Sequence, residues 1–151
     1  ARLSEILERA RQRARAQGLP YAGSLTPAEA HEVWQLAPAA RLVDVRSRAE
    51  WELVGRVPGT EQIEWAFYPG MTPNPDFLAQ LTRQVDREAL VMFLCRTGGR
   101  SHNAALLAAE NGYAGAYNIL EGFEGDADPE KKQRGGISGW RAAGLPWTNL
   151  G

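Results

Sequence analysis

The feature of this sequence that most constrains its fold is a short apolar run that leads directly into a glycine-rich loop. Residues 90–94 are all apolar and have the length of a strand. An unbroken apolar run is typical of a strand that is covered on both faces, as in parallel sheets. Cys95 comes directly after this run. Gly98 and Gly99 follow it, and a helical pattern begins at Ser101. We therefore expect a strand, a tight loop and a helix in direct succession.

Elsewhere the chain alternates strand-like segments with helical ones. Strand signals lie at 42–45, 62–64 and 116–120, and helical signals lie at 1–17 and 101–111, at the capping boxes 26–29 and 47–50, and after Asn74. Strands that alternate with helices indicate an α/β fold with a central, mostly parallel sheet and helices on both of its faces. The 151 residues correspond to one domain of ordinary size.

Composition excludes several classes of function. The formal net charge is −1, whereas nucleic-acid binding needs a clear basic excess, so we expect no nucleic-acid partner. No apolar run approaches the roughly 20 residues that a membrane span requires. A single cysteine and two histidines allow neither an intramolecular disulfide nor a Cys/His zinc site, and we expect no metal and no cofactor. The first residues carry no signal-peptide pattern, which leaves the cytoplasm as the default location.

Charge is concentrated at the start of the chain. Residues 1–17 contain five arginines and two glutamates, and their apolar residues recur at helical spacing. This pattern predicts an amphipathic helix that ends near Gly18. Such a basic helix has two interpretations: it contacts a membrane or a partner, or it packs on its own domain with its charges in solvent. We favour the second interpretation because the apolar stripe is narrow.

Residues 95–101 combine several features that favour an anion at the cysteine sulfur. The loop lies at the carboxyl end of a predicted parallel strand, where ligand sites gather in α/β sheets. Its glycines let backbone N–H groups turn inward, and the following helix adds the positive end of its dipole. Its two arginines add positive charges, and its two hydroxyl groups add hydrogen-bond donors. The residues of the loop are Cys95, Arg96, Thr97, Gly98, Gly99, Arg100 and Ser101. We predict a reactive thiolate, the alternative being a small buried residue that ends a strand.

This loop resembles the C-R-x-G-x-R-S active-site loop of rhodanese (thiosulfate sulfurtransferase) domains. Residues 42–46, 50–51 and 55–60 are similar to the D-V-R, E-[FWY] and G-H-I-P-G-A segments of that family, and residues 140–146 are similar to its closing W-x-x-A-G-L-P. The resemblance extends over residues 24–147. We therefore assign residues 1–23 to an N-terminal helix with its connection and residues 24–151 to a single rhodanese-like domain.

Two departures from the family pattern stand out. Arg56 occupies the position of the histidine in G-H-I. The family's L-x-G-G-x-x-x-W segment is split by an acidic, glycine-containing insertion between Gly122 and Gly136. The insertion is interpreted either as a surface loop or as a lid or partner-docking segment beside the active site.

The resemblance implies a sulfurtransferase in which Cys95 takes the outer sulfur of thiosulfate, or of a related donor, as a persulfide and passes it to cyanide or a thiol. We expect Arg96 to bind thiosulfate and Arg100 to turn inward to a carboxylate of Asp44 or Glu50. Arg46 is expected to pair with Glu50 in the same cluster, although these three supporting residues could equally serve as turn caps and a surface ion pair. With a single cysteine in the chain, the sulfur must leave on an external acceptor, either a small molecule or a protein.

Two other functions remain open. Dual-specificity phosphatases of the cell-cycle type share this fold and use a Cys-x5-Arg loop, whereas four residues separate Cys95 from Arg100 here. The shorter loop suits a single sulfur atom bonded to cysteine. A non-catalytic, partner-binding rhodanese-like module is the other alternative, but inactive versions typically lose the cysteine.

Several further side chains are candidates for the surroundings of the site. Trp65, Phe67 and Tyr68 either rim a pocket or belong to the core, which is the commoner place for aromatic residues. His102 follows the loop directly and is a weaker candidate to face the site. His31 lies in a capped helix and is not expected to act as a base.

Overall fold

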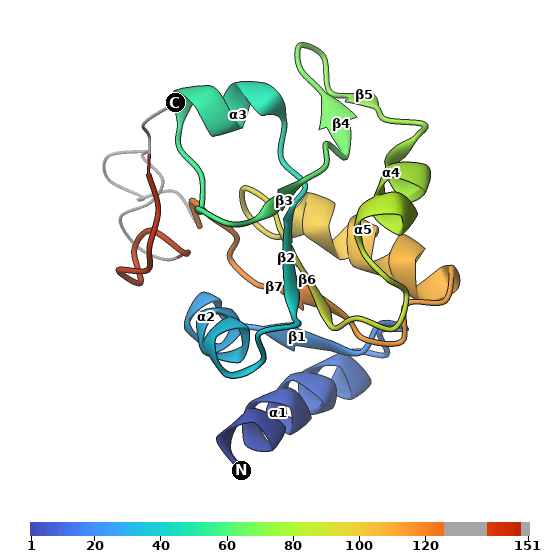
Figure 1. The fold of residues 1–151 in the computed structure, drawn as a ribbon, viewed down its shortest axis with the longest axis vertical. Coiled ribbons are helices and arrows are strands. Elements are labelled where there is room, and N and C mark those ends of the chain that lie inside the picture. The colour runs from blue at the N-terminus through green and yellow to red at the C-terminus, as the bar shows by residue number, and fades with distance from the viewer. Residues whose placement is uncertain (126–138, 149–151) are drawn as a thin grey trace.

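A parallel sheet forms the centre of the fold (Figure 1). The computed structural model describes residues 1–125 and 139–148. The strand order in the sheet is β1 (Gly23–Leu25), β7 (Ala116–Ile119), β6 (Val91–Leu94), β2 (Arg41–Asp44) and β3 (Glu61–Gln62), and every neighbouring pair is parallel. The predicted α/β fold with a parallel central sheet is thus confirmed.

Helices cover both faces of this sheet. One face packs against α1 (Arg2–Ala16) and α2 (Pro27–Leu36), and the other packs against α4 (Phe77–Gln84) and α5 (Gly99–Glu110). Beyond the carboxyl end of β2, Figure 1 shows α3 (Arg48–Leu53) beside a small antiparallel hairpin formed by β4 (Ala66–Phe67) and β5 (Thr72–Pro73). The sheet therefore has its two faces filled and its carboxyl end free for a site.

The side chains of β6 explain why its sequence shows no alternation. Val91, Phe93 and Cys95 belong to the core cluster beneath α4 and α5, whereas Met92 and Leu94 belong to the cluster beneath α1 and α2. Successive side chains of a strand point to opposite faces, so a central strand needs apolar residues at every position. This register also places the cysteine on the α5 side of the sheet.

Local signals in the sequence set most helix ends. Both capping boxes form, with Thr26 and Ser47 as N-caps. Helix α5 begins at Gly99, two residues earlier than predicted, because Gly98 adopts φ of 105° and turns the chain directly into the helix. Strand β1 and the β4–β5 hairpin were not predicted, since their two- and three-residue segments carry too little periodicity.

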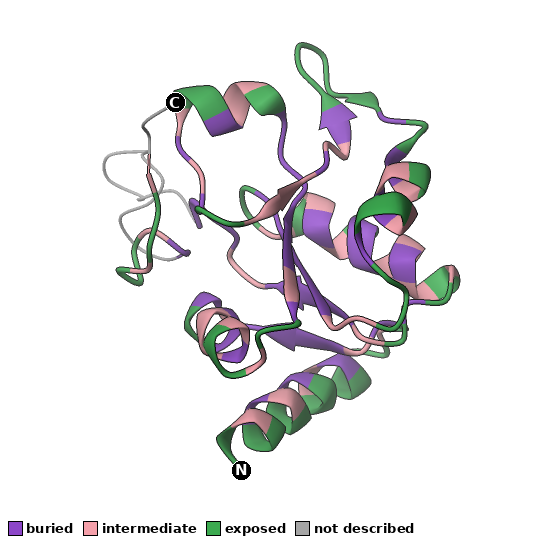
Figure 2. Cartoon of the chain, in the orientation of Figure 1, coloured by how far each residue is buried: buried purple, intermediate pink, exposed green. Residues whose placement is uncertain are grey.

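The basic helix α1 packs on its own domain, which confirms the favoured interpretation. Figure 2 shows its buried side turned toward the sheet and its exposed side turned outward. A Cβ atom at Gly23 of β1 would lie 2.7 Å from the backbone carbon of Ala10, so the helix approaches the strand as closely as glycine permits. Arg9 and Arg13 bind Glu29 of α2. No helix among the described residues is long and apolar enough to cross a membrane.

The Glu29 carboxylate fastens α1 to α2. Arg13 donates two hydrogen bonds to it, at 2.5 and 3.0 Å, and the Thr26 N–H donates a third at 2.9 Å. Burial raises the pKa of Glu29, but the hydrogen bonds from Arg13, Thr26 and Arg9 together outweigh burial and lower this pKa to about 2. The ionised carboxylate therefore contributes to folding at neutral pH.

We predict that Glu29→Gln lowers the free energy of unfolding at pH 7 by up to about 3 kcal/mol. The folded-state pKa lies below the usual 4.5, so the stabilisation is present above pH 4.5 and is lost as the pH falls toward 2. Urea unfolding at pH 7 and at low pH measures both effects. Glu32→Gln, which removes the exposed partner of Arg2, is the matched control and should change stability little. Equal destabilisation at both pH values would contradict this account.

Candidate active site

Cys95 lies at the carboxyl end of β6, under the first turn of α5. The residue is only 1% exposed. The Gly98 N–H donates a hydrogen bond to its Sγ at 3.0 Å, and the Ser101 Oγ lies 3.3 Å from the same sulfur. An N–H donor and the positive end of a helix dipole both favour a negative charge at this atom.

Asn118 extends the contacts around the sulfur, and sequence reasoning missed it. The Ser101 hydroxyl donates a hydrogen bond to Asn118 Oδ1 at 2.5 Å, and both residues are buried. Asn118 comes from β7, the neighbour of β6 in the sheet. The signal that could have revealed it is a polar side chain within an otherwise apolar strand, because buried polar groups need partners.

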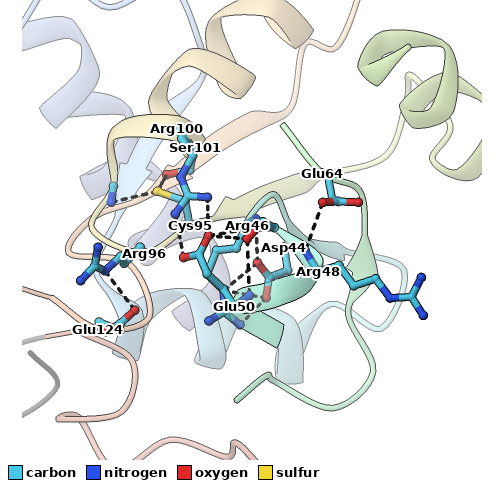
Figure 3. A network of polar contacts seen from close by, with 12 residues as sticks. Asp44, Arg46, Arg48, Glu50, Glu64, Cys95, Arg96, Arg100, Ser101 and Glu124 are labelled. Atoms are coloured by element: carbon cyan, nitrogen blue, oxygen red, sulfur yellow. Dashed lines mark hydrogen bonds and ion pairs between the residues drawn. The ribbon is translucent and has the colours of Figure 1, made fainter. Parts of the chain in front are cut away.

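Arg100 turns toward a carboxylate, as predicted, and that carboxylate belongs to Glu50. Its two terminal nitrogens donate to the two Glu50 oxygens at 2.6 and 2.8 Å, a bidentate pair that Figure 3 shows beside the cysteine. Glu50 also accepts from the Ser47 N–H and hydroxyl at the start of α3. Burial raises the pKa of Glu50, but Arg100 and Ser47 together lower it below its usual value. The pair therefore connects the cysteine loop to α3.

Asp44 and Arg46 form a separate, fully buried pair. Arg46 donates from Nε and Nη2 to the Asp44 carboxylate, at 3.0 and 2.8 Å, and both side chains are 0% exposed. Nη2 also donates to the Gly55 carbonyl at 2.7 Å, and the guanidinium lies 4.3 Å from the centroid of the Phe123 ring. The predicted Arg46–Glu50 pair is therefore wrong. Arg46 folds back onto Asp44, and the Glu50 carboxylate is occupied by Arg100 and the Ser47 cap. A surface ion pair is equally wrong for Asp44 and Arg46.

Arg96 lies at the edge of the site and also has a carboxylate partner. Its Nε lies 3.1 Å from Glu124 Oε2. Arg96 is about half exposed, whereas the Glu124 side chain is 10% exposed. Sequence reasoning missed Glu124 because it lies at the start of the predicted insertion. Residues 126–135 of that insertion lie outside the described residues, so the lid and docking interpretations stay predictions.

A cavity of about 580 Å³ opens above these residues. Its walls come from α3, the β4–β5 hairpin, the cysteine loop and the segment that follows β7. The lining residues are Ser47, Glu50, Val54, Tyr68, Met71, Arg96, Thr97, Arg100 and Glu124. Cys95 itself is buried and is not one of these lining residues. The cavity thus brings two guanidinium groups and two carboxylates together beside the loop that contains Cys95.

The aromatic candidates divide between the core and the cavity. Trp65 packs against the core beside Phe77, with ring centroids 4.9 Å apart. Tyr68 lines the cavity, and Phe67 is exposed outside its lining. The Nδ1 atom of His102 lies 2.7 Å from the Tyr21 hydroxyl, so this ring engages Tyr21 and is absent from the cavity lining.

Comparisons with known proteins agree with this geometry. A family model described as a rhodanese-like domain matches residues 29–128. The crystal structure of Rv0390 from M. tuberculosis is similar, with a TM-score of 0.79 and 46% identity, covering 86% of this chain and 99% of that chain. Uncharacterized protein RC0915 of Rickettsia conorii is 36% identical over 110 residues, which span 72% of this chain and 82% of the relative.

A further relative is named for its activity. Thiosulfate sulfurtransferase 16, chloroplastic, of Arabidopsis thaliana is 28% identical over 125 residues, which span 82% of this chain and 90% of that protein. The family model covers more than half of the chain, and the close structural match extends over almost all of a solved relative. The chain therefore belongs to the rhodanese-like domain family.

Proposed function

We propose that this chain is a sulfurtransferase that moves the sulfane sulfur of thiosulfate, or of a related donor, through a Cys95 persulfide to an external acceptor. The observation that carries the proposal is the setting of the Cys95 sulfur. It accepts the Gly98 N–H at 3.0 Å at the N-terminus of α5, in a loop whose Arg96 and Arg100 line a cavity. Membership of the rhodanese-like family and a relative named as a thiosulfate sulfurtransferase support the same chemistry.

In the first step the Cys95 thiolate attacks the outer sulfur of thiosulfate. A new S–S bond forms to Cys95, the original S–S bond of the donor breaks, and sulfite leaves with its electron pair. The enzyme keeps a persulfide whose outer sulfur carries the negative charge. The Gly98 N–H holds the Cys95 Sγ, and the helix dipole then stabilises the anion without any proton transfer.

In the second step a nucleophile attacks the outer sulfur of the persulfide and restores the Cys95 thiolate. Cyanide yields thiocyanate, and a thiolate yields an organic persulfide. The acceptor is external because the chain contains no second cysteine. A small thiol or a protein cysteine can serve in this role.

The two arginines have different roles in this proposal. Arg100 holds the loop, since its guanidinium is bound on two sides by Glu50. Arg96, half exposed at the edge of the cavity, faces the incoming anion. The four-residue spacing between Cys95 and Arg100 favours sulfur transfer over phosphoryl transfer, because a tighter loop suits one sulfur atom.

Cys95→Ser should lower thiosulfate:cyanide sulfur transfer by about 10³-fold or more, because the persulfide can no longer form. The wild-type protein should give parallel lines in double-reciprocal plots, since sulfite leaves before the acceptor binds. Steady-state kinetics with varied donor and acceptor measure both features. Circular dichroism should show that the variant retains its fold. Residual turnover near the wild-type rate would contradict the proposed nucleophile.

Glu50→Gln should lower kcat/KM by about 10- to 100-fold, because the Arg100 side chain loses its bidentate partner and the cysteine loop is no longer held in position. The lowered pKa of Glu50 means that its charge supports the loop at neutral pH and is lost as the pH falls through that depressed value. The wild-type protein should therefore show an acid limb in its activity profile that the variant lacks.

Glu52→Gln provides the matched control for this variant. Glu52 lies two residues further along α3, is exposed, and pairs with Arg48. This control should keep wild-type kcat/KM. A Glu50→Gln variant with the same kcat/KM and the same pH profile as the control would exclude a positioning role for Glu50.

A further inference from the structure

The charges that line the cavity are balanced. Arg100 is paired with Glu50, and Arg96 is paired with Glu124, so the formal charges of these four side chains cancel. Thiosulfate carries two negative charges, and its binding gains most from uncompensated positive charge. Glu50 has a structural role, because it forms the capping box at the start of α3 and binds Arg100. Among the described residues, the Glu124 side chain pairs with Arg96 and Arg141 and caps no helix, and its charge lowers the positive potential at the cavity edge.

The backbone holds Glu124 in this place. The Phe123 N–H donates to the Cys95 carbonyl at 2.8 Å, and the Glu124 N–H donates to the Arg96 carbonyl at 2.9 Å. A Cβ atom at Gly122 would lie 2.6 Å from both the Arg96 carbonyl carbon and its oxygen, so glycine is required for this close approach. Residues 122–124 are thereby fastened to the first two residues of the cysteine loop.

The Glu124 side chain competes with an incoming anion for Arg96. One carboxylate oxygen lies 3.1 Å from Arg96 Nε and the other lies 4.0 Å from Arg141 Nη2. The side chain is 10% exposed, so solvent and salt screen its charge less than they screen a surface charge. An anion in the cavity therefore meets a guanidinium whose charge is already partly compensated by Glu124.

Part of the cavity lining is apolar. Val54, Tyr68 and Met71 contribute to the lining, and Tyr68 and Met71 are 65% and 41% exposed. Large apolar side chains that remain in solvent at the edge of a cavity are typical of a surface that contacts a ligand. The volume of about 580 Å³ also exceeds what a five-atom inorganic anion fills.

We propose that Glu124 sets the charge selectivity of the site, so that the preferred sulfur donor is an organic carrier with a single negative charge and an apolar group. This inference rests on the proposed function and names the substrate class of the same site. Benzenethiosulfonate has the required chemistry: attack by the Cys95 thiolate on its outer sulfur forms the persulfide and releases benzenesulfinate. Its ring would contact the wall formed by Val54, Tyr68 and Met71.

The test compares a dianion with a monoanion. Glu124→Gln should tighten the binding of thiosulfate by about tenfold and that of benzenethiosulfonate by about threefold, because the Coulomb energy scales with ligand charge. Binding is measured by calorimetry in the Cys95→Ser background, where no sulfur transfer occurs, and KM is measured for both donors with Cys95 present. Glu88→Gln makes the same change in net charge at an exposed position outside this cavity, and it should alter neither value.

Tyr68→Ser tests the apolar wall independently. It should weaken benzenethiosulfonate binding by about fivefold and leave thiosulfate binding unchanged, because only the organic probe has a ring to pack.

Three results would overturn the inference. Unchanged affinity for thiosulfate in Glu124→Gln would show that Glu124 does not compete for Arg96. Weaker binding of both probes would show that Glu124 positions Arg96 instead. An equal gain in affinity for both probes would show that Glu124 does not discriminate between ligands by their charge. Failure of the wild-type protein to take up sulfur from either donor would refute the proposed function and leave the binding comparison to decide the charge selectivity.

Discussion

Burial of β6 on both faces is the constraint on which the rest of this structure depends. The strand must be apolar throughout, it must lie in the middle of a parallel sheet, and its carboxyl end must therefore open onto a free edge. The alternation of its side chains directs Cys95 toward α5. The left-handed turn at Gly98 then starts that helix immediately, so the Gly98 N–H and the helix N-terminus converge on the buried sulfur.

Around this sulfur the protein distributes charge in compensated pairs. Asp44 and Arg46 pair in the interior, and their pair joins the end of β2 to the Gly55 carbonyl. Glu50 caps α3 and holds Arg100, which couples the loop to a helix from a different part of the chain. Each pair thus fixes backbone as well as charge. Arg96 and Glu124 line the same cavity as Arg100 and Glu50, but the Arg96 side chain is about half exposed whereas that of Arg100 is mostly buried, and this difference leads to the charge selectivity that we propose.

The sequence was sufficient for the features that depend on local pattern. The two capping boxes, the apolar run of residues 90–94 and the cysteine loop are each contained in a few consecutive residues. The structure forms both capping boxes and the strand as predicted, and the loop connects strand to helix as predicted except that the helix begins two residues earlier. Apart from the turn of Arg100 toward a carboxylate, features made by tertiary contact were missed. Strand β1 has three residues and exists through its pairing with β7. The partnership of Arg96 with Glu124 arises from backbone hydrogen bonds between segments 26 residues or more apart, and the direction of the Arg46 side chain follows from burial.

The most direct test of the central claim is the intact mass of the protein after incubation with thiosulfate and removal of the excess donor. A Cys95 persulfide adds one sulfur atom, about 32 Da, releases one equivalent of sulfite, and is discharged by cyanide as thiocyanate. We predict this increment on the peptide that contains Cys95 and its loss after cyanide. An unmodified thiol, together with hydrolysis of an aryl phosphate by the same protein, would contradict the account and favour phosphoryl transfer.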